Sequence, residues 1–156
     1  MYKFRTDNKY LYVGVVRIFD NLSSSTDIGR THSVRLWINP DKENAQIYSH
    51  FYDLQIDLAF NTLATQAKHN TSSTSNVPEN ITNTSLEAKA SIDQHKVVFE
   101  FKVELAEFGG ENGFAYFLDY AYDGTGNGFT LYAQDIAKSA ANDYSNFPYN
   151  SWYKAG

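Results

Sequence analysis

The chain has 156 residues, a formal net charge of −5, 42% hydrophobic residues, 16% aromatic residues and no cysteine. These values predict a single folded domain over residues 1–156 and exclude wholesale disorder, disulfide bonds, cysteine nucleophiles and thiolate metal sites. The negative charge, without any run of Lys and Arg, argues against nucleic acid as a partner, and no apolar run is long enough for insertion into a membrane as a helix.

Short runs of alternating apolar and polar residues predict β-strands along most of the chain, since successive strand side chains point to opposite sides of a sheet. A first short strand is expected before a turn at 6–9. The further strands are predicted at residues 10–18, 33–39, 46–51, 53–60, 86–92, 97–104, 114–120 and 129–134. A hairpin turn is expected at 93–96, and one helical turn ended by glycine at 105–110.

The strand at 33–39 shows the pattern most clearly. Val34, Leu36 and Ile38 share one face, whereas Arg35 and Trp37 fall on the other. An apolar face opposite a polar and aromatic face is typical of antiparallel sheets that pack in pairs. The sequence therefore predicts an all-β fold, an antiparallel β-sandwich of jelly-roll or immunoglobulin-like type.

One long segment lacks any such pattern. Residues 61–85 are rich in Asn, Thr and Ser, hold few charges, and show neither the period of a strand nor that of a helix. Loops of this length inside a compact domain are uncommon and are usually functional or mobile. We expect a flexible Asn/Thr/Ser-rich loop at 61–85.

Catalytic motifs are missing from the sequence. The four histidines lie far apart, and there is no nucleophile elbow, P-loop or His-Glu-x-x-His motif. A glycosidase would need two carboxylates that face each other at about 5 to 10 Å, and no acidic pair stands out. We therefore expect that the protein is not an enzyme.

Oxygen-bearing side chains around glycine-rich turns raise the possibility of a calcium site, because calcium prefers carboxylate, amide and carbonyl oxygens. The alternative is a glycine-rich turn that binds no ion. The candidate metal ligands are Asp119, Asp123, Asn127, Asp20 and Asp27.

Aromatic and polar residues on outward strand faces indicate a surface for sugars. Sugar rings present C–H patches that lie against aromatic faces, and their hydroxyl groups need hydrogen-bonding partners. The candidate stacking platforms are Trp37, Trp152 and Tyr132, and the candidate polar partners are Arg35, Gln55, Asp57, Gln134 and Asn150. The alternative is that Arg35 and Asp57 form a cross-strand ion pair and that the tryptophans fill gaps.

Several stretches carry a resemblance to a known family: residues 7–13, 33–41, 53–56, 96–103 and 150–152. In these stretches the chain resembles family 9 carbohydrate-binding modules and the wider group of DOMON-like β-sandwiches. The resemblance implies a secreted or cell-surface sandwich that binds polysaccharides or oligosaccharides as an accessory module of a glycan-active protein, often with structural calcium.

The residues carry this resemblance over in part. Trp152 matches one of the two tryptophans that clamp a terminal sugar in family 9, whereas no aromatic residue stands near residues 28–29, where the other belongs. The family has a glutamate at the position of Arg35 and an arginine at the position of Asp57, so the two charges are exchanged in this chain. Haem binding of the DOMON type is not expected, because Met1 is the sole methionine. The family's first and last strands have no counterpart, which indicates either a trimmed fragment or a sandwich that is completed differently, by further domains or a partner chain.

Together these observations predict non-catalytic carbohydrate binding, with Trp152 as the stacking platform. The alternative is a structural or adhesion sandwich that contacts protein. Burial of Trp37 and Trp152 would favour that alternative.

Overall fold

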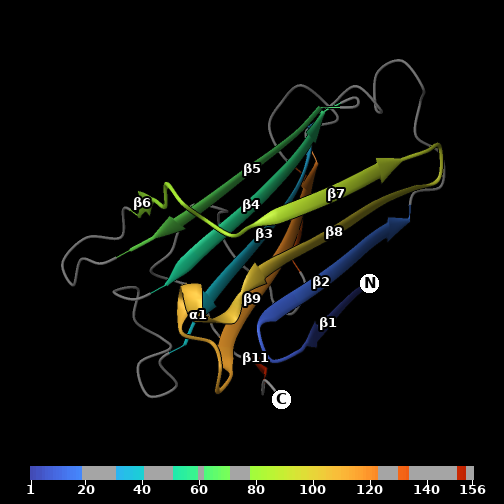
Figure 1. Cartoon of the computed structure of the whole chain (residues 1–156). Helices are drawn as coiled ribbons and strands as arrows, with labels where there is room; N and C mark the ends of the chain where they lie inside the picture. Colours follow the sequence, from blue (N-terminus) through green and yellow to red (C-terminus); the bar gives the residue numbers. More distant parts are fainter. Residues whose placement is uncertain are drawn as a thin grey trace.

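The computed structural model describes residues 1–18, 31–40, 51–59, 62–70, 78–122, 130–133 and 151–153. Its strands form two antiparallel sheets that lie face to face (Figure 1). The small sheet has the order β1 (Tyr2–Thr6), β2 (Tyr10–Ile18), β8 (Lys96–Glu104), β7 (Glu87–Ile92). The predicted antiparallel β-sandwich is confirmed.

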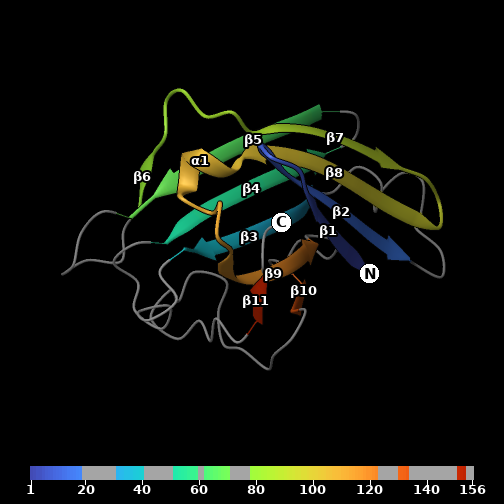
Figure 2. The same cartoon turned by 60° about the horizontal axis from the view of Figure 1, so that its bottom comes forward.

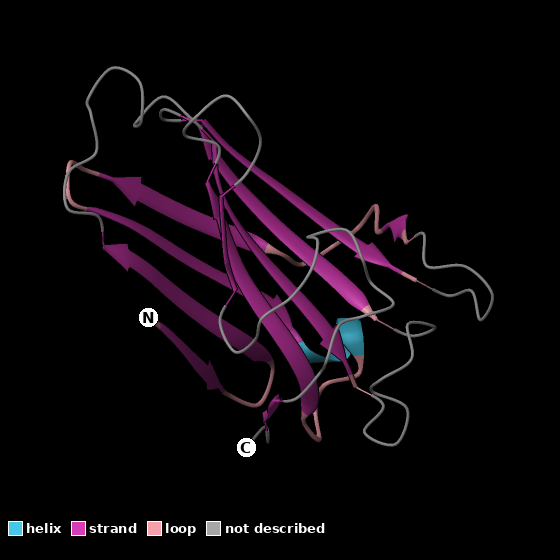
Figure 3. Ribbon diagram, turned by 180° about the vertical axis from the view of Figure 1, so that it is seen from behind, coloured by secondary structure: helices cyan, strands magenta, loops and turns pink. Residues whose placement is uncertain are grey.

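The large sheet forms the second layer. Its order is β10 (Thr130–Ala133), β9 (Phe114–Tyr122), β3 (Thr31–Asn39), β4 (Tyr52–Ala59), β5 (Thr62–His69), β6 (Glu79–Asn80). A short strand, β11 (Ser151–Tyr153), also pairs with β9, at the opposite end of the edge that β10 occupies (Figure 2). Figure 3 shows the same two layers of strands from behind.

The core lies between the two sheets and follows the alternation in the sequence. From the large sheet, Val34, Leu36 and Ile38 of β3 point inward and are fully buried. From the small sheet, Val97 and Phe99 of β8 meet them in the same apolar cluster. This burial of apolar surface from both layers is what holds the sandwich together.

Aspartate residues shape the two hairpin turns of the small sheet. The Oδ1 atom of Asp7 accepts hydrogen bonds from the backbone N–H groups of Lys9 and Tyr10, at 2.8 and 2.6 Å. The same atom of Asp93 accepts from His95 and Lys96, at 2.8 and 2.9 Å. The turns predicted at 6–9 and 93–96 are confirmed, with the side-chain hydrogen bonds typical of Asp in turns.

The single helical turn predicted after β8 is also confirmed. Helix α1 (Leu105–Phe108) buries Leu105 and Phe108 and ends at Gly109, whose φ of 72° lies in the left-handed region. Residues with a β-carbon rarely adopt this conformation, so glycine suits the end of the helix.

The expected loop at 61–85 is wrong for a good part of its length. Thr62–His69 forms β5, which pairs along its whole length with β4, and β6 pairs with the end of β5. The inward positions of β5 carry Leu63, Thr65, Ala67 and His69. Since only one of the four is strongly apolar, the alternation is too weak to be seen in the sequence.

Two further strands differ from the prediction or lie beyond its test. The strand expected at 46–51 lies outside the described residues, apart from Phe51. Strand β11 was not predicted, because three residues are too few to show a period.

Phe99 offers a test of the core. Its ring is fully buried and packs edge-on against Tyr120, with 6.0 Å between the ring centroids. Phe99→Ala should lower the free energy of unfolding by about 3–5 kcal/mol in urea denaturation, because it leaves a cavity. The exposed neighbour provides the control: Glu100→Ala should change it by no more than about 0.5 kcal/mol. Equal losses in the two variants would contradict this description of the core.

Candidate functional site

The predicted sugar-binding residues on β3 and β4 do share one face, the outer face of the large sheet. The register places Arg35 opposite Gln55 and Trp37 opposite Asp53. Asp57 lies further along the same face. The four predicted residues therefore share a face, and what decides their function is whether a ligand can reach them.

Trp37 is out of reach, which corrects its assignment as a stacking platform. Its side chain is 0% exposed. The indole packs against the ring of Phe117, with 5.2 Å between centroids, and the guanidinium of Arg35 lies 4.7 Å from the indole centroid. The physical reason is that β3 is buried on both faces from His32 to Asn39.

Arg35 is held by an acidic partner rather than presented to a ligand. Its Nη2 atom donates to Oδ2 of Asp53 at 2.7 Å, and both side chains are nearly inaccessible. The sequence suggested Asp57 as the partner. Asp57 instead accepts hydrogen bonds from the Ser33 hydroxyl and from Nε2 of Gln55. The buried pair of Arg35 and Asp53 therefore serves the fold, whereas Gln55 and Asp57 are half-buried and their role as sugar contacts stays a prediction.

The remaining predicted site residues cannot be tested by side-chain geometry. For Trp152, Tyr132 and Asp119 the structure describes the backbone alone; Trp152 pairs with Ala115, and Asp119 with Arg35. The others lie outside the described residues: Asn150, Gln134, Asp20, Asp27, Asp123 and Asn127. Within the described part of the chain, no three His, Cys, Asp or Glu side chains cluster as metal ligands would. Calcium binding stays a prediction.

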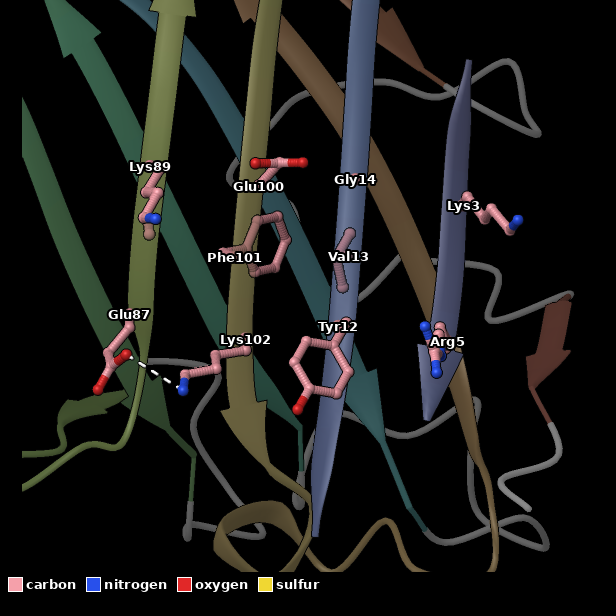
Figure 4. A pocket seen from close by; sticks show the side chains of 11 residues that line it. Lys3, Arg5, Tyr12, Val13, Gly14, Glu87, Lys89, Glu100, Phe101 and Lys102 are labelled. Carbon is pink, nitrogen blue, oxygen red and sulfur yellow. Dashed lines mark ion pairs between the residues drawn. The ribbon is translucent and has the colours of Figure 1, made fainter. Parts of the chain in front are cut away.

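An open cavity lies elsewhere, on the outer face of the small sheet (Figure 4). Its volume is about 620 Å³. We call it the Gly14 hollow. It is lined by Lys3, Arg5, Tyr12, Val13, Gly14, Glu87, Ala88, Lys89, Glu100, Phe101 and Lys102.

The missing side chain of Gly14 makes the floor of this hollow. Gly14 stands between Lys3 of β1 and Glu100 of β8 in the sheet register. A β-carbon added to it would meet no atom within 4 Å. Its φ is not positive, so the backbone does not demand glycine here. Space, rather than chain conformation, is what glycine provides at this position.

Tyr12 borders the hollow with a ring that is fixed in place. It is 37% exposed, and its hydroxyl donates to Oδ2 of Asp7 at 2.9 Å. This bond raises the pKa of the Tyr12 phenol. Backbone N–H groups of Tyr10 and Lys9 hold the pKa of Asp7 below its usual value, so the acceptor stays charged. An aromatic ring oriented in advance loses little entropy when a ligand binds.

Charged side chains complete the rim. Lys102 forms an ion pair with Glu87, with 3.4 Å between Nζ and Oε2, and its ammonium lies 4.6 Å from the ring centroid of Tyr10. Lys3, Arg5, Lys89 and Glu100 are exposed and form no ion pair with any residue that the structure describes. They are therefore available to a ligand.

The residue pattern alone did not predict this site, although one signal for it is present in the sequence. A glycine inside an otherwise apolar and aromatic strand marks a place where another molecule or backbone comes close. Gly14 occupies such a position, and the residues on either side in the register are charged.

Comparison with known proteins gives no relative: no family model, curated protein or solved structure matches this chain. The resemblance to family 9 modules thus remains a prediction from the sequence. Among the described residues, no helix has the length and apolar character needed to cross a membrane.

The buried ion pair on the large sheet can be tested by stability. Arg35→Ala should lower the free energy of unfolding by about 3–5 kcal/mol, because it leaves the Asp53 carboxylate buried without its cation. The exposed pair is the control: Lys102→Ala, which removes the bond to Glu87, should cost about 0–1 kcal/mol. Urea denaturation measures both, and a loss in Arg35→Ala as small as in the control would refute a structural role.

The link between Asp7 and Tyr12 can be tested by titration. Asp7→Asn should lower the pKa of Tyr12 toward its ordinary value of about 10, since the neutral amide no longer favours the protonated phenol. Nuclear magnetic resonance of protein labelled with ¹³C at tyrosine Cζ would follow the change, with Tyr12→Phe identifying the signal. An unchanged or higher pKa would show that the carboxylate does not hold the ring.

Proposed function

We propose that this protein is a non-catalytic carbohydrate-binding β-sandwich whose ligand lies in the Gly14 hollow. The supporting observation is an open cavity of about 620 Å³ on a rigid sheet face, next to the partly exposed ring of Tyr12. Sheet positions hold binding groups more precisely than loops do. The function is thus the carbohydrate binding predicted from the sequence, but the proposed site lies on the small sheet and not on the large sheet that carries Arg35 and Trp37.

The chemistry of the lining residues suits a sugar. The ring of Tyr12 provides an apolar face for the C–H side of a pyranose. Lys3 and Arg5 offer hydrogen-bond donors to hydroxyl groups, and the carboxylate of Glu100 offers acceptors. A sugar hydroxyl both donates and accepts, so a rim that combines these groups can satisfy several hydroxyls at once.

A hydrolytic role fits this surface less well. The two carboxylates of the hollow are Glu87 and Glu100. Glu87 is bound to Lys102 and its side chain is 73% exposed, whereas a general acid needs a desolvated carboxyl. Binding without catalysis is therefore the function proposed. In line with the resemblance, we also propose that the protein is secreted or lies on the cell surface and that it binds calcium as a structural ion.

A second candidate, an adhesion sandwich that contacts protein, is favoured by one feature of the same face. Ile18 is 60% exposed. Two residues further along the same face of β2, the half-buried Val16 pairs with the half-buried Val98 of β8. Exposed apolar residues that adjoin one another are common where proteins meet. The burial of Trp37 points the same way, because it removes one expected sugar platform.

Gly14→Leu separates these functions. The added side chain has room above the sheet, so the fold should persist while the hollow is filled. Isothermal titration calorimetry against a panel of neutral and acidic oligosaccharides, with calcium or a chelator, should show at least a tenfold loss of affinity, equivalent to about 1.4 kcal/mol. Tyr12→Ala should cause a similar loss.

Ser91→Leu is the matched control, since Ser91 is exposed on the same face but does not line the hollow. It should bind like the unmodified protein. If no oligosaccharide binds to the folded protein, the carbohydrate function fails and the protein-contacting alternative gains.

A further inference from the structure

The charges around the Gly14 hollow are unequal. Four lining side chains are cationic and two are anionic, although the whole chain carries a net charge of −5. One cation and one anion, Lys102 and Glu87, are already bound to each other. This leaves three cations, Lys3, Arg5 and Lys89, against the single carboxylate of Glu100.

The positions of these cations favour contact with a ligand in the hollow. Figure 4 shows Lys3 and Arg5 on β1 along one side of the hollow, and Lys89 on β7 along the other. Lys3 stands beside Gly14 in the register, and Arg5 stands beside Tyr12. A sugar lying on the Tyr12 ring would thus have the guanidinium of Arg5 next to it. Lys3 extends away from Gly14 in this view, but an exposed lysine has a flexible stem and several staggered positions, some of which bring its ammonium toward the hollow.

The carboxylates nearby offset this charge only in part. Asp7 does not line the hollow, but it is charged and interacts electrostatically with Arg5. Glu100 is the cross-strand neighbour of Lys89 in the pairing of β8 with β7, so the cation on the β7 side has a carboxylate beside it. The β1 side of the hollow is therefore the more positive one.

From this arrangement, and resting on the proposed function, we infer that the glycan bound in the hollow is anionic, with a carboxylate or sulfate group that meets Arg5 and Lys3. Hydrogen bonds between a cationic donor and an anionic acceptor are roughly twice as strong as neutral ones, and guanidinium matches the planar carboxylate with paired bonds. A neutral sugar would leave the repulsion between the cations in place. Attraction at such an exposed site is screened by salt, so binding should weaken as ionic strength rises.

Matched ligands provide the test. Calorimetry would compare an oligogalacturonate with its fully methyl-esterified form, which has the same sugar backbone without the charge. A chondroitin sulfate hexasaccharide would also be compared with its desulfated form, which keeps the glucuronate carboxylates, so a difference between these two would show that sulfate is the group recognised. At least one charged ligand should bind tenfold or more tightly than its matched form, and several-fold more weakly at 300 mM than at 50 mM NaCl.

Variants locate the effect. The double variant Lys3→Gln and Arg5→Gln should lose at least tenfold in affinity for the charged ligand, with circular dichroism confirming the fold. Lys96→Gln is the control, because Lys96 is an exposed lysine of the same sheet that does not line the hollow. It should change affinity less than twofold. Equal losses in both would show a non-specific charge effect and overturn the assignment.

The outcomes separate this inference from the function on which it rests. Equal binding of charged and neutral ligands that Gly14→Leu abolishes would support carbohydrate binding and overturn the anionic specificity. If charged ligands bind tightly and the double variant binds them with the same affinity, the role of Lys3 and Arg5 is refuted. No binding of any ligand would overturn both proposals.

Discussion

Burial of β3 on both of its faces is the constraint on which the rest of the structure depends. One face belongs to the apolar core, and on the other face Trp37 is fully buried and Arg35 is nearly inaccessible. A buried guanidinium is tolerated because Asp53 neutralises it at 2.7 Å and because its flat surface lies on the indole. The consequence is that the central strand of the large sheet serves stability, and its outer polar residues are occupied with one another.

The small sheet has the same alternation but a different arrangement. Its inner residues enter the core, while its outer residues, such as Tyr12 and Glu100, remain in reach of solvent. Two neighbouring features make this face suitable for a ligand: the space above Gly14 and the hydrogen bond that fixes Tyr12. The space above Gly14 lets a ligand reach the sheet, and the hydrogen bond orients the Tyr12 ring before a ligand binds. Arg35 and Trp37 are buried and offer a ligand no such access.

Much of the fold was predictable from the sequence, because strong alternation specifies strands directly. The predicted strand at 10–18 coincides with β2, and the aspartate turns and the glycine after α1 follow from local chemistry. β5 escaped prediction because Thr65 and Ala67 contribute little apolar signal, and its pairing with β4 is a tertiary effect. The candidate site was predicted less well. Alternation assigns Trp37 to the outer face correctly, but it does not tell whether that face is covered.

Gly14 has a further consequence, which concerns evolution. The backbone there does not require glycine, and a β-carbon added to it would meet no atom within 4 Å. Selection for folding therefore places little demand on this position, and selection for the ligand can act on it alone. A lineage could narrow or deepen the hollow by single substitutions at residue 14 without compensating changes in the core. Recognition and stability would then diverge independently in descendants of this sandwich.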